Sequence, residues 1–163
     1  MKLNIDLSLK QLFTSKQYSG QNVQRPGMAK LLAEESNRHW EDGINVLKKH
    51  LQIGGLVDDS FLNYFTFTGK GELGGVYIAQ NYRNTMLNLV KTSRAMVNTL
   101  TDYHYVAIQS TTLPPYGDLD VAHFLSELAE KEAEIAYKMT TGYLIHESIA
   151  SSGVALDMFD ENL

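Results

Sequence analysis

Residues 26–55 read PGMAKLLAEESNRHWEDGINVLKKHLQIGG, and this stretch decides the class of fold. Pro26 suits the first turn of a helix, because its missing N–H would have no partner there. Gly54 and Gly55 are typical of a helix end. The stretch therefore predicts a helix of about 27 residues and about 40 Å, longer than the usual globular helix. Its apolar residues recur at helical steps: Met28, Leu32, Trp40, Ile44, Leu47 and Leu51.

Two more long helical segments follow, over residues 76–108 and from about residue 118 to 150. Asp118 or Asp120 can cap the second of them. A short amphipathic tail, residues 154–163, comes after the Ser151-Ser152-Gly153 interruption. Long helices of matching length with few breaks indicate a bundle, and the connection over residues 56–75 is long enough to cross its full length.

The N-terminal segment is open to two interpretations. Residues 3–9 alternate between apolar and polar, which favours a strand. Ile5, Leu9 and Leu12 equally fit one face of a helix.

Length and composition limit the possible functions. The chain has 163 residues, which suits a single domain over residues 1–163. Its net charge of −5 argues against nucleic acid as a partner. No cysteine is present, which excludes disulfide frameworks and thiolate catalysis. No apolar run approaches the roughly 20 residues of a membrane span, and the first residues lack the apolar core of a secretory signal.

Four stretches carry a resemblance to a known family. They are residues 18–31 (YSGQNVQRPGMAKL), residues 40–44 (WEDGI) with the Gly54-Gly55 stop, residues 120–125 (DVAHFL) and residues 156–161 (LDMFDE). In order and spacing they resemble insect secreted ferritin, and specifically its light-chain homologue.

The resemblance implies an all-α, ferritin-like four-helix bundle with one long crossover and a short fifth helix. It implies assembly with other ferritin subunits, heavy chains among them, into a 24-subunit shell around a ferric oxyhydroxide mineral. It also implies the secretory pathway or the extracellular space, although the missing signal peptide leaves the cytoplasm open.

The resemblance also bears on iron oxidation. A ferroxidase centre needs carboxylates and imidazole from several helices. Between Glu72 and Asp118 the only acidic residue is Asp102. By alignment, the family's tyrosine falls near Gln11. We therefore expect a light-chain subunit that is not an enzyme. The aligned ligand positions hold Asn4, His39, Asp42, Ser93 and Ala133, the last of them beside Glu132.

Carboxylates on the helix of residues 26–52 are the candidate iron ligands, since carboxylate oxygen suits a hard cation. His39 and Asp42 lie three residues apart and could share a metal ion, although a solvated polar face would show the same pattern. The candidate metal residues are Glu34, Glu35, Glu41, Asp42 and His39, of which only Glu41 aligns with a cavity glutamate of the family.

Two rival functions are consistent with the same residues. One is a divergent ferroxidase or other di-metal enzyme that uses His39, Asp42 and Glu132. The other is a helical interaction module, for which the aromatic connection over residues 61–67 is the best argument.

Overall fold

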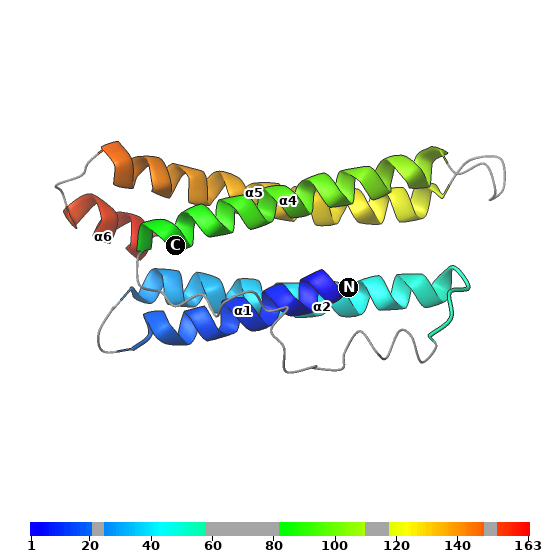
Figure 1. Ribbon diagram of the computed structural model, residues 1–163, viewed down its shortest axis with the longest axis horizontal. Helices are drawn as coiled ribbons and strands as arrows, with labels where there is room; N and C mark the ends of the chain where they lie inside the picture. Colours follow the sequence, from blue (N-terminus) through cyan, green and yellow to red (C-terminus); the bar gives the residue numbers. More distant parts are fainter. Residues whose placement is uncertain (21–24, 58–81, 110–117, 149–152) are drawn as a thin grey trace. The chain divides into compact units, whose positions relative to one another are not determined.

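The computed structural model describes residues 1–20, 25–57, 82–109, 118–148 and 153–163. In these ranges all regular structure is helical, and the all-α prediction is confirmed (Figure 1). The helices are α1 (Lys2–Tyr18), α2 (Pro26–Gln52), α4 (Tyr82–Gln109), α5 (Leu119–Ser148) and the short fifth helix α6 (Gly153–Glu161).

The helix boundaries lie at the proline, glycine and capping residues expected from the sequence. Pro26 is the first residue of α2, and Gly54 beyond its end has φ +86°, a conformation that glycine adopts without strain. Asp118 caps α5, because its Oδ1 accepts a hydrogen bond from the Val121 amide at 2.9 Å. The predicted crossover, from residue 58 onward, and the predicted start of α4 over residues 76–81 lie outside the described residues.

The chain divides into two compact units. The first comprises residues 1–80 and 157–163 and is built on the antiparallel pair of α1 and α2. The second comprises residues 81–156 and is built on α4 and α5. None of the described helices combines the length and hydropathy needed to cross a membrane.

Helix α1 buries a mainly polar stripe. The N-terminal segment is helical, so the strand alternative is wrong. The apolar face expected from Ile5, Leu9 and Leu12 is not the buried one, since Leu12 is 38% exposed. The apolar residues of α1 are scattered around the helix and form no single apolar face. The face of α1 that meets α2 is instead the one whose polar groups find hydrogen-bond partners on α2. That face consists of Asn4, Leu7, Ser8, Gln11, Thr14, Ser15 and Tyr18.

Small side chains explain how a polar stripe can pack closely on α2. Ser36 Oγ donates to the Ser8 carbonyl oxygen at 2.8 Å, and Ser15 Oγ donates to the Ala29 carbonyl oxygen at 2.7 Å. A Cβ at Gly43 would lie 3.3 Å from Ile5 Cγ1. Small residues at these points allow the backbones to approach, because interaxial distance depends on the side chains at the contact.

A residue near the C-terminal end of α6 caps the first turn of α2. Asp160 is 3% exposed, and its carboxylate accepts hydrogen bonds from the Gly27 and Met28 amides at 2.9 and 3.0 Å. The first amides of a helix have no partner within it, and a negative charge suits this end of the helix dipole. A Cβ at Gly27 would lie 1.5 Å from the Asp160 carbonyl oxygen, so this contact requires glycine. Arg25 and Asp157 form an ion pair beside it.

The α4–α5 pair has an apolar core instead. At its margin, the exposed Arg83 pairs with Glu147 and donates to the Tyr143 hydroxyl at 2.9 Å. The hydrogen bond from Arg83 lowers the pKa of the Glu147 carboxyl. Buried apolar residues of the pair include Met86, Leu89, Val90, Met96, Leu100, Ala122, Leu128, Ile135, Ala136 and Met139.

The Asp160 cap makes a testable contribution to stability. Asp160→Ala removes both acceptors from the first turn of α2, and we expect it to lower the free energy of unfolding by about 1–2 kcal/mol. Urea denaturation followed by circular dichroism measures the loss. Glu161→Ala, at the exposed neighbouring acid, is the control and should change stability by less than about 0.5 kcal/mol. Equal losses in the two variants would show that the cap does not stabilise α2.

Candidate functional site

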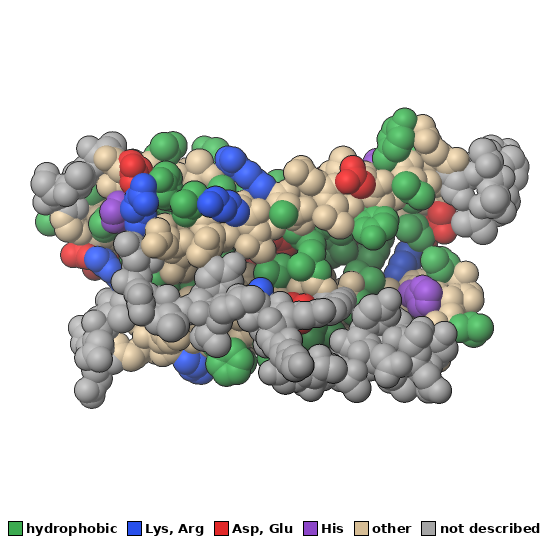
Figure 2. Space-filling view, in the orientation of Figure 1, with side chains coloured by type: hydrophobic (Ala, Val, Ile, Leu, Met, Phe, Trp, Pro, Cys, Tyr) green, Lys and Arg blue, Asp and Glu red, His purple; other side chains and the backbone are tan. Residues whose placement is uncertain are grey.

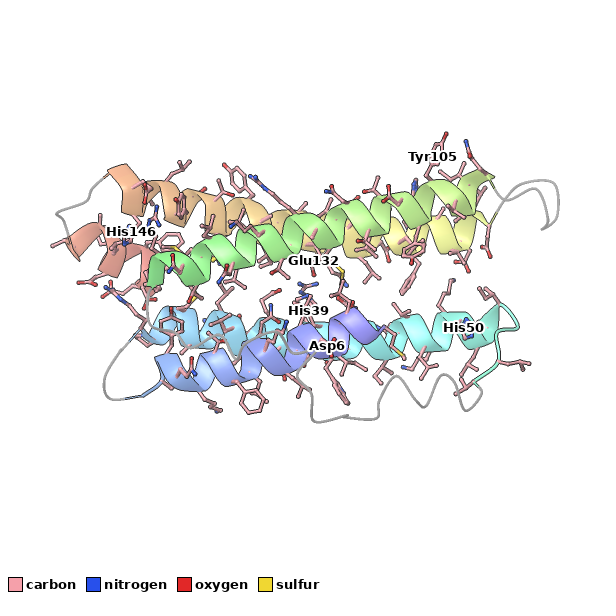
Figure 3. All side chains as sticks on the ribbon, in the orientation of Figure 1. Asp6, His39, His50, Tyr105, Glu132 and His146 are labelled. Carbon is pink, nitrogen blue, oxygen red and sulfur yellow. The ribbon has the colours of Figure 1, made fainter. Side chains whose placement is uncertain are left out.

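The five predicted metal residues lie on two different faces of α2. Glu34 and Glu41 are exposed and seven residues apart, which places them on one side of the helix two turns apart. Glu35, His39 and Asp42 are buried, with exposures of 7%, 2% and 4%. His39 lies midway along α2, where α1 runs beside it (Figure 3). The structure therefore does not bring the five together.

Arg38 links the buried acids. Its Nε and Nη2 donate to Glu35 Oε2 at 2.9 and 2.5 Å, and its Nη1 donates to Asp42 Oδ2 at 3.1 Å. All three side chains are largely shielded from water: that of Arg38 is 18% exposed, that of Glu35 9% and that of Asp42 5%. One guanidinium thus neutralises part of the charge of two buried carboxylates, one turn away on either side.

His39 faces the same guanidinium. Its Nδ1 lies 2.9 Å from the Glu35 carbonyl oxygen and 2.7 Å from Gln11 Oε1. Because a carbonyl oxygen can only accept, Nδ1 carries a hydrogen and donates it. Arg38 Nη2 lies 3.4 Å from Nε2. We call Glu35, Arg38, His39 and Asp42 the Arg38 cluster.

The carboxylates of the Arg38 cluster are bound by a guanidinium. Within the described ranges, no three histidine, aspartate or glutamate side chains are arranged to hold a metal ion. The importance of Arg38 was not predicted from the sequence. Its spacing of three from Glu35 and four from Asp42 was the available signal, since such pairs are neighbours on a helix surface.

The remaining aligned positions are neutral or point elsewhere. Asn4 on α1 and Ser93 on α4 are buried, with exposures of 5% and 4%, and each offers an uncharged side chain. On α5, Ala133 is exposed whereas its neighbour Glu132 is 2% exposed, so Glu132 occupies the buried face. Burial thus distinguishes two neighbours that sequence alignment could not.

Two other features of the second unit do not resemble metal sites. His123, three residues after Asp120, has a side chain that is 75% exposed and lies 3.2 Å from Glu127 on the surface of α5. A groove of about 390 Å³ between α4 and α5 has no carboxylate or imidazole in its lining. It is lined by Arg94, Val97, Asn98, Ala133, Ala136, Tyr137 and Thr140.

Comparison with known proteins supports the fold. No protein-family model matches this sequence, and no curated protein does. Among solved structures, Trichoplusia ni secreted ferritin is similar to it with a TM-score of 0.79 and 19% sequence identity, over 99% of this chain and 76% of that one. The chain therefore has the all-α, ferritin-like bundle fold.

The hydrogen bond between Gln11 and His39 should stabilise the α1–α2 pair. Gln11→Leu keeps a side chain of similar size but removes the acceptor, and we expect a loss of about 1 kcal/mol in the free energy of unfolding. Gln52→Leu, at an exposed position of α2, is the matched control and should be nearly neutral. Chemical denaturation of the two variants measures the difference. A neutral Gln11→Leu would mean that the bond to His39 contributes nothing.

Proposed function

We propose that this chain is an iron-storage subunit of light-chain type, which helps to build a ferritin-like shell and has no ferroxidase centre of its own. Residues 1–163 would form one ferritin-like domain. Iron is the cargo of this shell, held as a ferric oxyhydroxide mineral, and not a resident cofactor. The proposal includes a secreted or secretory-pathway location, which the likeness to a secreted ferritin supports.

The observation that carries the proposal is the chemistry of the buried positions within a ferritin-like fold. Iron oxidation needs carboxylates and imidazole that are free to bind metal. Asn4, Gln11 and Ser93 are buried and uncharged. The acids that are buried on α2, Glu35 and Asp42, are bound by Arg38. Together these residues support a subunit that leaves oxidation to heavy-chain partners.

Exposed apolar side chains support assembly. Hydrophobic side chains lie at the surface over the C-terminal end of α4 (Figure 2). Tyr103, Tyr105 and Val106 are 61%, 61% and 64% exposed there, and Tyr105 projects outward from the helix (Figure 3). Tyr103 and Val106, three residues apart, are neighbours on the helix surface, and exposed apolar patches are typical of protein contacts. In a shell of 24 subunits, such surfaces would be covered by neighbours.

Mineral nucleation is assigned to the exposed acids of α2. Glu34 and Glu41 share one face, and Lys30 is the only cation paired with either of them among the described ion pairs, at 4.0 Å from Glu34. Solvent-accessible carboxylates can bind hydrolysed ferric iron. Glu35, His39 and Asp42 are buried around Arg38. Of the five candidate residues, only Glu34 and Glu41 are therefore assigned to nucleation.

The purified chain should store iron without oxidising it. We expect iron(II) mixed with the chain alone to oxidise no faster than in buffer, and addition of an oxidising partner chain to restore rapid loading. Sedimentation velocity with detection at a ferric absorbance should show a large iron-bearing particle when the protein is taken from its natural source. Rapid oxidation by the chain alone would favour the divergent ferroxidase. A small iron-free species would favour the interaction module.

Replacing the exposed acids should slow mineral formation. The double variant Glu34→Gln/Glu41→Gln removes two carboxylates from the nucleation face, and we expect a slower rise of ferric absorbance from shells loaded with iron(III). Glu130→Gln/Glu134→Gln removes the same charge from exposed positions of α5 and is the matched control. If both double variants slowed mineral formation equally, the loss of net charge alone would explain the effect. That result would contradict the assignment of nucleation to α2.

A further inference from the structure

The groove between α4 and α5 combines an apolar lining with polar side chains that have no partner. Its volume of about 390 Å³ lies within the range of small-molecule sites. Val97, Ala133 and Ala136 supply its apolar surface, and the two alanines lie one turn apart on α5. Because alanine side chains are short, they leave room beside α4 that larger residues would fill.

Arg94 is the charged residue of this lining. It is exposed on α4, and within the described part of the chain its guanidinium has neither an ion pair nor a hydrogen bond. The surrounding part of α4 offers no acid, since residues 82–101 contain neither aspartate nor glutamate. Glu130 and Glu134 are exposed on α5, but neither of these two described acids pairs with Arg94. The groove therefore presents a positive charge without a counter-charge.

Two neutral polar side chains line the groove together with Arg94. Asn98 lies one turn beyond it on α4, and Tyr137 on α5 is 77% exposed. Neither the Asn98 amide nor the Tyr137 hydroxyl forms a hydrogen bond to any other described residue. Both groups can donate one, and the ring of Tyr137 adds an aromatic surface. Thr140 differs, because its hydroxyl donates to the Ala136 carbonyl oxygen at 2.7 Å.

These groups together select the chemistry of a ligand. A guanidinium suits a carboxylate, because the two planar groups can form two parallel hydrogen bonds. The short apolar side chains of α5 and the ring of Tyr137 suit a flat apolar body, because aromatic rings stack offset or edge to face. A molecule that carries both features would use the charge and the apolar surface of the groove at once.

We propose that the α4–α5 groove binds a small aromatic carboxylate, with the carboxylate on Arg94 and the ring against Tyr137 and the alanines of α5. The Asn98 amide supplies a further donor to the ligand's oxygens. This inference concerns α4 and α5 alone and does not depend on iron storage.

Isothermal titration calorimetry of the full, mineral-free chain with 2-naphthoate tests the proposal, and the neutral 2-naphthamide is the matched probe. We expect 2-naphthoate to bind at one site per chain, at least about tenfold more tightly than 2-naphthamide, because only the carboxylate forms a charge-assisted pair with Arg94. Arg94→Gln should remove this preference. Lys91→Gln removes the same charge from an exposed position of α4 outside the lining and should behave as the wild type.

A second variant fills the groove without changing its charge. Ala133→Leu should weaken the binding of both probes, whereas Ala95→Leu, at an exposed alanine of α4 outside the lining, should change neither. Leucine is a good helix former, so both variants should keep the fold. The proposal would be overturned by wild-type protein that does not bind 2-naphthoate or binds both probes equally. Arg94→Gln protein that keeps the preference, or Ala133→Leu protein that binds as the wild type, would overturn it too.

Discussion

The contact between α1 and α2 depends on pairing polar groups that the two helices bury. On α2, Arg38 lies between the Glu35 and Asp42 carboxylates. Removing one partner of a buried ion pair costs about 3–5 kcal/mol, which is a large share of the stability of a typical domain. Gln11 reaches His39 from α1, so the same cluster also fixes the register of the helix pair. The small residues around it, Ser8 and Ser36, satisfy each other across the contact.

The two helix pairs are held together by different interactions. Burial of methionine, leucine and isoleucine holds α4 on α5, and this interaction is non-directional. The α1–α2 contact buries Ser8, Gln11 and Ser15, so its strength depends on geometry. Hydrogen bonds tolerate little displacement, whereas apolar contacts can repack. The Asp160 cap adds a further directional contact, which ties the end of the chain to the start of α2.

Fold and chemistry are separable in this molecule. A ferritin-like bundle fixes where side chains can converge, but the residues at those positions decide what they do. Here Asn4 and Ser93 bring no charge, and Arg38 offsets part of the charge of Glu35 and Asp42. The acids of α2 that remain accessible, Glu34 and Glu41, lie on its other face. A chain of this kind can keep the architecture of its fold while the buried positions serve stability.

The sequence by itself determined the long helices after residue 25, because their causes are local, whereas it left residues 3–9 open between strand and helix. Pro26 begins α2, Gly54 lies just beyond its end, and apolar residues at steps of three and four fill the length between them. The candidate acids of α2 were also visible in the sequence. Only the tertiary structure decided which of them are buried, which face of α1 meets α2, and what binds the start of α2. Gln11 and His39 are 28 residues apart, and Gly27 and Asp160 are 133 apart, so nothing in either local pattern predicts the partner. The buried stripe of α1 is polar, so no periodic pattern of apolar residues marks it in the sequence. Its burial is stabilised by hydrogen bonds to α2, which form only when the two helices are packed together.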